Sequence, residues 1–127
     1  MTPTLTPAER RNLLAAQPNP DNRLDYVVTV TGRIRAADES CEVELRYVPD
    51  RLVLETTAFE DYLGAMSRER WDNLEHAAVT LLDDLHDQLV ARWIQLSVTG
   101  GHGHSILLED RQPKWENPQL LQRLKRL

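Results

Sequence analysis

Alternating hydrophobic and polar positions predict two strands in the first half of the chain. Over residues 24–35 the apolar side chains fall on one face and mostly polar ones on the other, and residues 41–47 repeat this alternation. The polar stretch 36–40 turns the chain, so the two strands should pair as an antiparallel hairpin. Pro49 cannot donate to a central ladder, so we expect the second strand to bend there and to resume over residues 52–56.

A hydrophobic repeat of three and four residues then predicts two helices, over residues 58–66 and 69–88, with Ser67 as an N-cap between them. The longer helix carries an apolar stripe that must pack against the strands: Leu74, Ala77, Ala78, Leu81, Leu82, Leu85 and Leu89. The acidic pairs of the two helices are interpreted as solvated positions: Glu60 with Asp61, and Asp83 with Asp84.

Two more strands are predicted after the helices, over residues 91–99 and 105–109, joined by a glycine-rich hairpin loop. Asn117 and Pro118 supply an N-cap and a first-turn proline for a terminal helix. The order of elements predicts an α+β fold: a four-stranded antiparallel sheet (ββααββ) with two helices on one face, plus a C-terminal helix.

The chain has the length of one domain. We expect residues 23–110 to form it, residues 1–22 to be an N-terminal lead-in, and residues 111–127 to be a tail with the short helix. The lead-in holds four of the seven prolines and a short predicted helix over residues 7–16, capped by Thr6.

Composition narrows the functional classes. The formal charge is −5 and most of the 15 Lys and Arg residues are scattered, which argues against nucleic acid or a membrane surface as partner. Cys41 is the only cysteine, so an internal disulfide is excluded. The sequence shows no leader-like start and no run of membrane-spanning length, and a cytoplasmic protein is expected.

Several fragments occur in order between residues 19 and 106: Asn19-Pro20, Tyr26, Tyr47-Val48-Pro49-Asp50, Leu54-Glu55, Tyr62-Leu63, Glu75, Asp83-Asp84-Leu85 and Ala91-Arg92-Trp93. Their order resembles the NADPH-dependent 7-cyano-7-deazaguanine reductases, the nitrile reductases of the queuosine pathway. The resemblance implies the tunnelling fold (T-fold), in which several subunits join their sheets into a barrel with ligand sites at subunit boundaries. We therefore expect a homo-oligomer, and ring closure would also remove the exposed sheet edges.

The same resemblance implies that Glu75 anchors a flat heterocycle, with Glu55 and Tyr62 near the pocket. A carboxylate suits this role because its two oxygens can accept two adjacent N–H groups of a guanine-like or pterin edge. The alternative is a solvated helix glutamate.

The residues that carry out nitrile reduction in the family have weaker counterparts in this chain. In the family, a loop cysteine attacks the nitrile to give a thioimide and an aspartate then transfers a proton. Here the corresponding connection is short, and Cys41 falls in the alternation at a core-facing position, where a thiol is inert. Asp38 could act as the acid only if the loop were rearranged.

The family's NADPH-binding motif reads Glu, any, Lys, Ser, any, Lys, whereas this chain has Glu55-Thr56-Thr57-Ala58-Phe59-Glu60. Both lysines are missing and an acid replaces one, which disfavours a phosphate. The family's Pro-Arg-Gly-Gly turn is likewise replaced by His102-Gly103-His104-Ser105. NADPH is therefore not expected, and neither is any other resident cofactor.

His102 and His104 indicate one exception. Residues two apart in a strand share a face, so the pair could bind Zn²⁺ with further ligands, and pyruvoyl-tetrahydropterin synthases carry a similar His-Gly-His. The alternative is two loop histidines in a glycine-rich turn.

The sequence thus predicts a binder of a purine-, deazapurine- or pterin-like small molecule at a subunit interface that does not reduce it. One alternative is enzymatic: a nitrile reductase using Cys41, or a metal-dependent pterin-type enzyme using the two histidines. A purely structural role in an assembly is the other.

Overall fold

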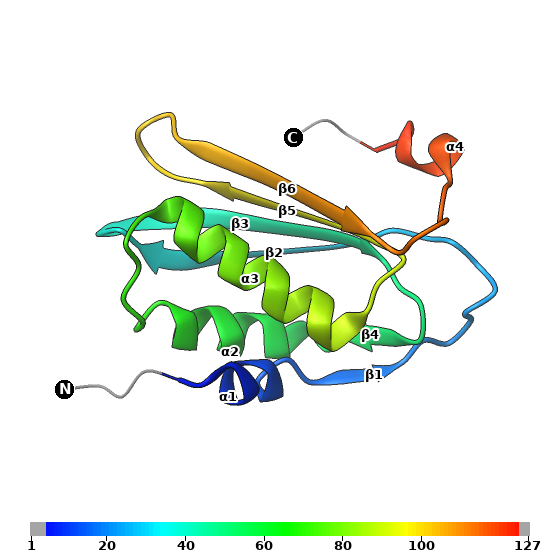
Figure 1. Ribbon diagram of the computed structural model, residues 1–127, viewed down its shortest axis with the longest axis horizontal. Coiled ribbons are helices and arrows are strands. Elements are labelled where there is room, and N and C mark those ends of the chain that lie inside the picture. Colours follow the sequence, from blue (N-terminus) through cyan, green and yellow to red (C-terminus); the bar gives the residue numbers. More distant parts are fainter. Residues whose placement is uncertain (1–4, 125–127) are drawn as a thin grey trace.

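A computed structural model describes residues 5–124 of the chain (Figure 1). Its main sheet has four antiparallel strands: β2 (Val28–Ala36), β3 (Glu39–Val48), β5 (Trp93–Thr99) and β6 (Ser105–Arg111). Their spatial order is β2-β3-β5-β6, so two hairpins lie side by side and the second strand of the first hairpin pairs with the first strand of the second. This is the predicted antiparallel sheet.

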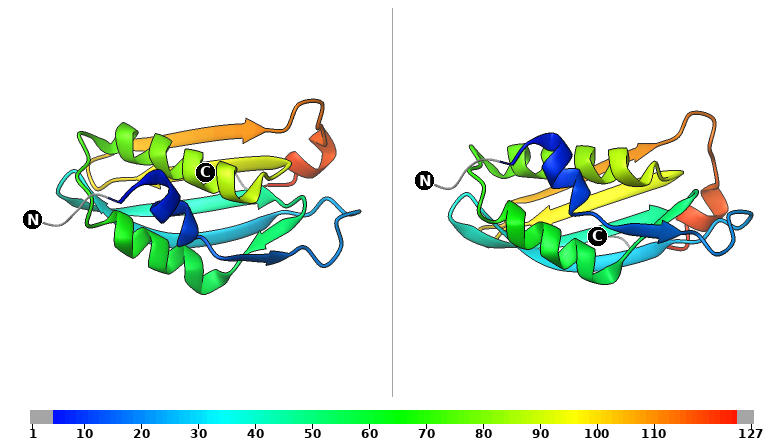
Figure 2. Two further views of the ribbon diagram at one scale, coloured as in Figure 1. Left: turned by 60° about the horizontal axis from the view of Figure 1, so that its bottom comes forward. Right: turned by 90° about the horizontal axis from the view of Figure 1, so that it is seen from below.

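Two helices, α2 (Thr56–Met66) and α3 (Leu74–Leu89), cover one face of this sheet (Figure 2). α2 packs over β2, and α3 packs over β5 and β6. The alternating residues of the strands and the stripe of α3 meet in one core, in which Leu45, Leu81 and Leu96 are fully buried. The ββααββ order and the single helical layer confirm the predicted α+β class and agree with the T-fold arrangement.

The N-terminal residues contribute a small second sheet that the sequence does not indicate. β1 (Ala16–Pro18) follows helix α1 (Pro7–Asn12) and pairs antiparallel with β4 (Leu52–Leu54). The prediction that residues 52–56 resume the second strand of the main sheet is therefore wrong. After the bend at residues 48–50, β4 pairs with β1 instead. Tyr47 holds this bend, since its hydroxyl accepts the Leu54 N–H at 2.9 Å.

The longer helix begins later than predicted. α3 starts at Leu74, and its N-cap is Asn73, whose side chain accepts the His76 N–H at 2.7 Å. Ser67 is the C-cap of α2 instead: its hydroxyl donates to Leu63 O at 2.7 Å and accepts the Arg35 N–H at 2.9 Å. The stretch between the two helices is thus a connection that contacts the end of β2.

Asp84 is wrongly predicted to be solvated. Its carboxylate is fully buried and accepts hydrogen bonds from the Tyr62 hydroxyl at 2.6 Å and from Arg10 at 2.9 and 3.3 Å. The Arg11 guanidinium lies 3.3 Å away. Both arginines belong to α1, so Asp84 fixes the N-terminal helix on the helical layer.

The C-terminal tail is attached through Asp25. Its carboxylate accepts hydrogen bonds from Arg92 at 2.9 Å, Asn117 at 3.1 Å and Trp115 at 3.2 Å. Helix α4 (Pro118–Leu121) follows, with Asn117 as its N-cap as predicted. Within residues 5–124, no helix combines the length and the hydropathy that crossing a bilayer would require.

Candidate functional site

Most of the predicted site residues meet at one end of the main sheet. Four segments form this end, which we call the loop end: the β2–β3 turn, residues 67–73 between the helices, the first turn of α3, and the β5–β6 loop of residues 100–104 (Figure 1). Segments far apart in sequence come together here because both hairpins of the sheet turn at the same end.

Glu75 lies at the loop end in the first turn of α3, where a carboxylate interacts favourably with the positive end of the helix dipole. Its side chain is 60% exposed, and Oε1 lies 3.4 Å from Nε2 of His104 in the β5–β6 loop. The carboxylate is therefore open to a ligand while one oxygen has a polar neighbour that can orient it.

Cys41 is also near the loop end, but it faces the core. The residue is fully buried, as its place in the strand alternation predicts, and its sulfur lies 3.7 Å from Oε1 of Glu39. Burial raises the pKa of the Cys41 thiol, and the nearby Glu39 carboxylate raises it further. The thiol is consequently protonated at neutral pH and hidden from a solute, which is the opposite of an activated nucleophile.

His102 and His104 lie near different carboxylates. Nε2 of His102 is 3.9 Å from Glu39, whereas His104 is paired with Glu75. The two residues lie in a loop, with Gly103 between them at φ 75°, so they do not share a strand face. Among residues 5–124 there is no group of three or more His, Cys, Asp or Glu residues that could hold a metal ion. A Zn²⁺ site on this pair stays a prediction that the donor geometry of a single chain does not support.

Glu55 and Tyr62 are not brought together with Glu75. Glu55 is the exposed N-cap residue of α2, at the end of that helix opposite to the loop end. Tyr62 is fully buried beside Asp84. Burial raises the pKa of the Tyr62 hydroxyl, and its hydrogen bond to Asp84 raises it further, so this hydroxyl acts as a structural donor.

The start of α2 offers no cation where the resembling motif has lysines. Thr57 and Glu60 occupy those two positions, and both are exposed. An acidic side chain at an exposed phosphate-binding position repels the phosphate, so the residues present do not fit NADPH in the family's manner.

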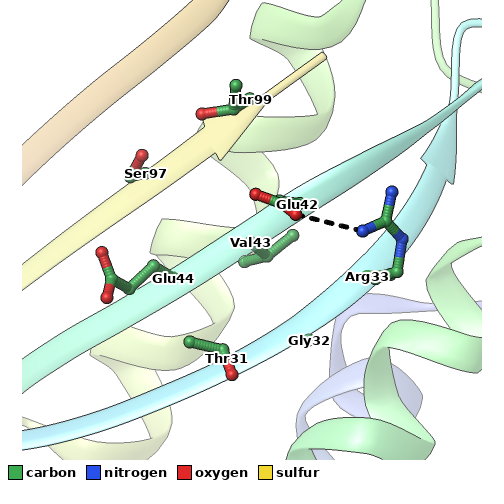
Figure 3. Close-up of a pocket in the computed structure, with 8 residues that line it drawn as sticks. All are labelled: Thr31, Gly32, Arg33, Glu42, Val43, Glu44, Ser97 and Thr99. Carbon is green, nitrogen blue, oxygen red and sulfur yellow. Dashed lines mark hydrogen bonds and ion pairs between the residues drawn. The ribbon is translucent and has the colours of Figure 1, made fainter. Parts of the chain in front are cut away.

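A separate pocket of about 480 Å³ lies on the uncovered face of the sheet, which is the face opposite to α2 and α3 (Figure 3). Figure 3 shows Arg33 reaching the Glu42 carboxylate at 3.3 Å across neighbouring strands. The remaining lining residues are hydroxyl-bearing, acidic or small: Thr31, Gly32, Val43, Glu44, Ser97 and Thr99. None of the predicted site residues lines this pocket.

A smaller pocket of about 360 Å³ lies at the loop end, between the β2–β3 turn and the connection of the two helices. Asp38 is one of its lining residues, in the turn at φ 63°. Sequence reasoning singled out Asp38 but missed the rest of this pocket, which includes Arg35, Arg70 and Trp71. Arg35 is close to Asp38 in the chain but belongs to no motif, and Arg70 and Trp71 lie more than thirty residues further on. Only the fold reveals that these residues line one pocket.

The fold and this end of the molecule define an α+β protein with a ββααββ core, an exposed carboxylate and a buried thiol. No protein-family model matches the chain. Among curated proteins, it is similar to NADPH-dependent 7-cyano-7-deazaguanine reductases. The resemblance that the ordered fragments indicate is thereby confirmed.

The similarity to these reductases extends over most of each chain. The reductase of Acidithiobacillus ferrooxidans is 27% identical over 119 residues, covering 84% of this chain and 82% of the relative. That of Nitrosococcus oceani is 28% identical over 132 residues, covering 91% and 97%. That of Syntrophus aciditrophicus is 27% identical over 141 residues, covering 89% and 97%. Among solved structures, the apo form of the archaeosine synthase QueF-Like matches with 20% identity and a TM-score of 0.47, over 67% of this chain and 89% of that one.

Proposed function

We propose that this protein binds a purine-, deazapurine- or pterin-like heterocycle through Glu75 and does not reduce it. One observation carries the proposal: the Glu75 carboxylate is 60% exposed at the loop end, whereas the only thiol, that of Cys41, is fully buried. The group suited to recognition is available to a ligand, and the group needed for covalent attack on a nitrile is not.

The chemistry of a carboxylate matches the donor edge of these heterocycles. Guanine, 7-deazaguanine and pterins each present a ring N–H beside an amino group, and two carboxylate oxygens can accept both hydrogen bonds together. His104, 3.4 Å from Oε1, restrains the carboxylate and offers a ring nitrogen to the heterocycle's polar rim.

Two further observations support the proposal that the protein does not reduce its ligand. The pKa of the Cys41 thiol is raised by burial and by Glu39, so a thiolate is scarce at neutral pH. Residues 55–63, where the reductases keep their lysine-bearing motif, contain no Lys or Arg. A hydride donor of the NADPH type therefore lacks its phosphate contacts.

We propose in addition that the ligand site is completed by a second copy of the chain. β2 and β6 each pair with a neighbour on one side only, and joining these edges between copies would satisfy their unpaired backbone groups. In such a ring the exposed Glu75 would lie at a seam between protomers, which is the site that the T-fold resemblance implies.

Calorimetric titration with 7-cyano-7-deazaguanine, guanine and pterin tests the proposal. Wild type should bind at least one of them, and Glu75→Gln should bind it about tenfold or more weakly, because a hydrogen bond to a charged group contributes roughly 1.5–3 kcal/mol. Asp83→Asn is the matched control, since it removes one exposed carboxylate from the same helix and should leave binding unchanged. Absence of binding by folded wild type, or equal binding by Glu75→Gln, would refute the proposal and favour a purely structural role.

A second candidate function, nitrile reduction, is favoured by the activity of the curated relatives, which are named as NADPH-dependent 7-cyano-7-deazaguanine reductases. In that case the Cys41 sulfur would add to the nitrile carbon, and the nitrile nitrogen would take up a proton to give a thioimide. Intact-mass measurement after incubation with the nitrile would then find one added ligand on wild type and none on Cys41→Ala. NADPH oxidation that depends on Cys41 would likewise overturn the non-reducing proposal.

A further inference from the structure

The pocket at the loop end beside Asp38 has a charge pattern that neither the predicted site nor the comparisons assign. Two arginines line it, Arg35 near the end of β2 and Arg70 in the connection between α2 and α3. Within residues 5–124, neither guanidinium has a hydrogen bond or an ion pair. Most other arginines of the sheet and of α1 do have carboxylate partners, so this pair is not typical of the chain.

Three acids line the pocket as well, Asp38, Glu69 and Asp72, and two of them have partners of their own. The Glu69 carboxylate accepts a hydrogen bond from the Leu5 backbone N–H at 2.8 Å. Asp72 lies 3.5 Å from Nδ1 of His76. Asp38 is the one remaining acid, exposed at the turn. Among residues 5–124, the side chains of the two arginines and of Asp38 thus have no protein partner, whereas Glu69 and Asp72 keep their negative charge beside partners of their own.

An aromatic side chain completes the lining. The Trp71 indole is held in place by its N–H, which donates to Met66 O at 2.9 Å, and by an edge contact with the His76 ring at a centroid distance of 5.2 Å. The ring is half-buried, and one part of it lines the pocket. A fixed, partly exposed indole is a surface on which a flat ring or a sugar can pack.

Each of these groups matches one part of a nucleotide. A guanidinium group suits a phosphate because of its planar, bidentate hydrogen bonds, and a carboxylate such as that of Asp38 suits the hydroxyls of a ribose. The pocket volume of about 360 Å³ is within the range of roughly 300–1,000 Å³ that is typical of small-molecule sites.

We propose that this pocket binds the 5′-phosphate and ribose of a purine nucleoside monophosphate, so that the ligand of this protein is a nucleotide instead of a free base. The inference rests on the proposed function, in which Glu75 takes the base. Trp71 precedes Glu75 by only four residues, and both belong to the loop end. A ligand that reaches from the carboxylate to the arginine pair follows the surface of one end of the molecule.

Titrations with guanine, guanosine and GMP separate the contributions of base, sugar and phosphate. Wild type should bind GMP about tenfold or more tightly than guanosine, since each charge-assisted contact to phosphate adds affinity even when solvent screens it. The double variant Arg35→Gln/Arg70→Gln should lose this advantage and still bind guanosine as wild type does. Arg51→Gln is the matched control, because Arg51 is an exposed arginine at the opposite end of the molecule.

Salt and competition provide a second measurement. The preference for GMP should shrink as ionic strength rises, because exposed charges more than about 8 Å apart are largely screened at physiological salt and closer ones are weakened. Inorganic phosphate should compete with GMP and not with guanosine.

The outcomes distinguish this inference from the proposed function. Equal affinity for guanosine and GMP, with both lost in Glu75→Gln, would overturn the phosphate site and leave the proposed function intact. A GMP preference that survives in the double arginine variant would also overturn it, because the phosphate would then lie elsewhere. Absence of binding of all three compounds to folded wild type would refute both.

Discussion

Removing the buried carboxylate of Asp84 should strongly destabilise the fold. Asp84 is fully buried, and Arg10 is 17% exposed at its side chain, so the pair is screened little by water. Asp84→Ala eliminates the hydrogen bonds from Arg10 and the 2.6 Å bond from Tyr62, and it leaves the Tyr62 hydroxyl buried without an acceptor. The perturbation thus has an ionic part and a desolvation part.

The expected loss is about 3 kcal/mol in the free energy of unfolding. Breaking a buried ion pair from one side costs roughly 3–5 kcal/mol. The lower end applies because both arginines keep some exposure, Arg11 at 32% of its side chain, and can turn toward water. Such a loss is a large fraction of the roughly 5–15 kcal/mol that stabilises a typical domain.

Urea unfolding, followed by tryptophan fluorescence, measures this loss for Asp84→Ala. Tyr62→Phe should lower the free energy of unfolding by about 1 kcal/mol. The double variant should lose less than the sum of the two single losses, because both changes remove the same Tyr62–Asp84 hydrogen bond. Asp83→Ala, on the exposed side of the same helix, should stay within about 0.5 kcal/mol of wild type. Trypsin should also cut at Arg10 and Arg11 faster in Asp84→Ala, since α1 loses its attachment. A cooperative unfolding transition of Asp84→Ala within about 0.5 kcal/mol of wild type would refute this reasoning.

Two further predictions concern Cys41 and Asp25. Cys41 is fully buried and the pKa of its thiol is raised, so a thiol reagent should modify it only after unfolding; rapid modification of native protein at neutral pH would contradict this. Burial raises the pKa of Asp25, but hydrogen bonds from Asn117, Arg92 and Trp115 outweigh burial and bring it below the usual value. Asp25 therefore stabilises the fold above its unfolded pKa of about 3.9, and this contribution disappears as the pH falls through the lower folded pKa. The stability difference between wild type and Asp25→Asn should accordingly be largest at neutral pH and shrink as the pH falls below the unfolded pKa of about 3.9; a difference that stays constant with pH would refute it.

The main sheet and α3 were predictable because their hydrophobic periods are regular. Burial alternates along the first part of β3, and Cys41, Val43, Leu45 and Tyr47 are all buried as expected. The leucine stripe of α3 packs on the sheet as its three- and four-residue spacing indicates. Glu75 could be singled out only through the resemblance, because nothing in its local sequence distinguishes it from a solvated glutamate.

The failures have a common cause. Asp84 occupies a buried position seven residues after Ala77 and three after Leu81, and this spacing was the one available signal, but its partners on α1 are more than seventy residues away in sequence. β4 is only three residues long, and its partner β1 contains a proline, so neither has a recognisable period. Interactions between distant segments leave no local pattern.

The sequence by itself determined the α+β class, the ββααββ order of the main elements and the core-facing position of Cys41, because each follows from periodicity along a continuous stretch. The missing lysines could be recognised only through the family resemblance. Only the tertiary structure decided which side chains meet at the loop end. It separated Tyr62 and Glu55 from Glu75, paired Glu75 with His104, and brought Arg35 and Arg70 to one pocket. The physical reason is that burial and proximity depend on how hairpins and helices stack, and one stretch of sequence does not specify its neighbours in space.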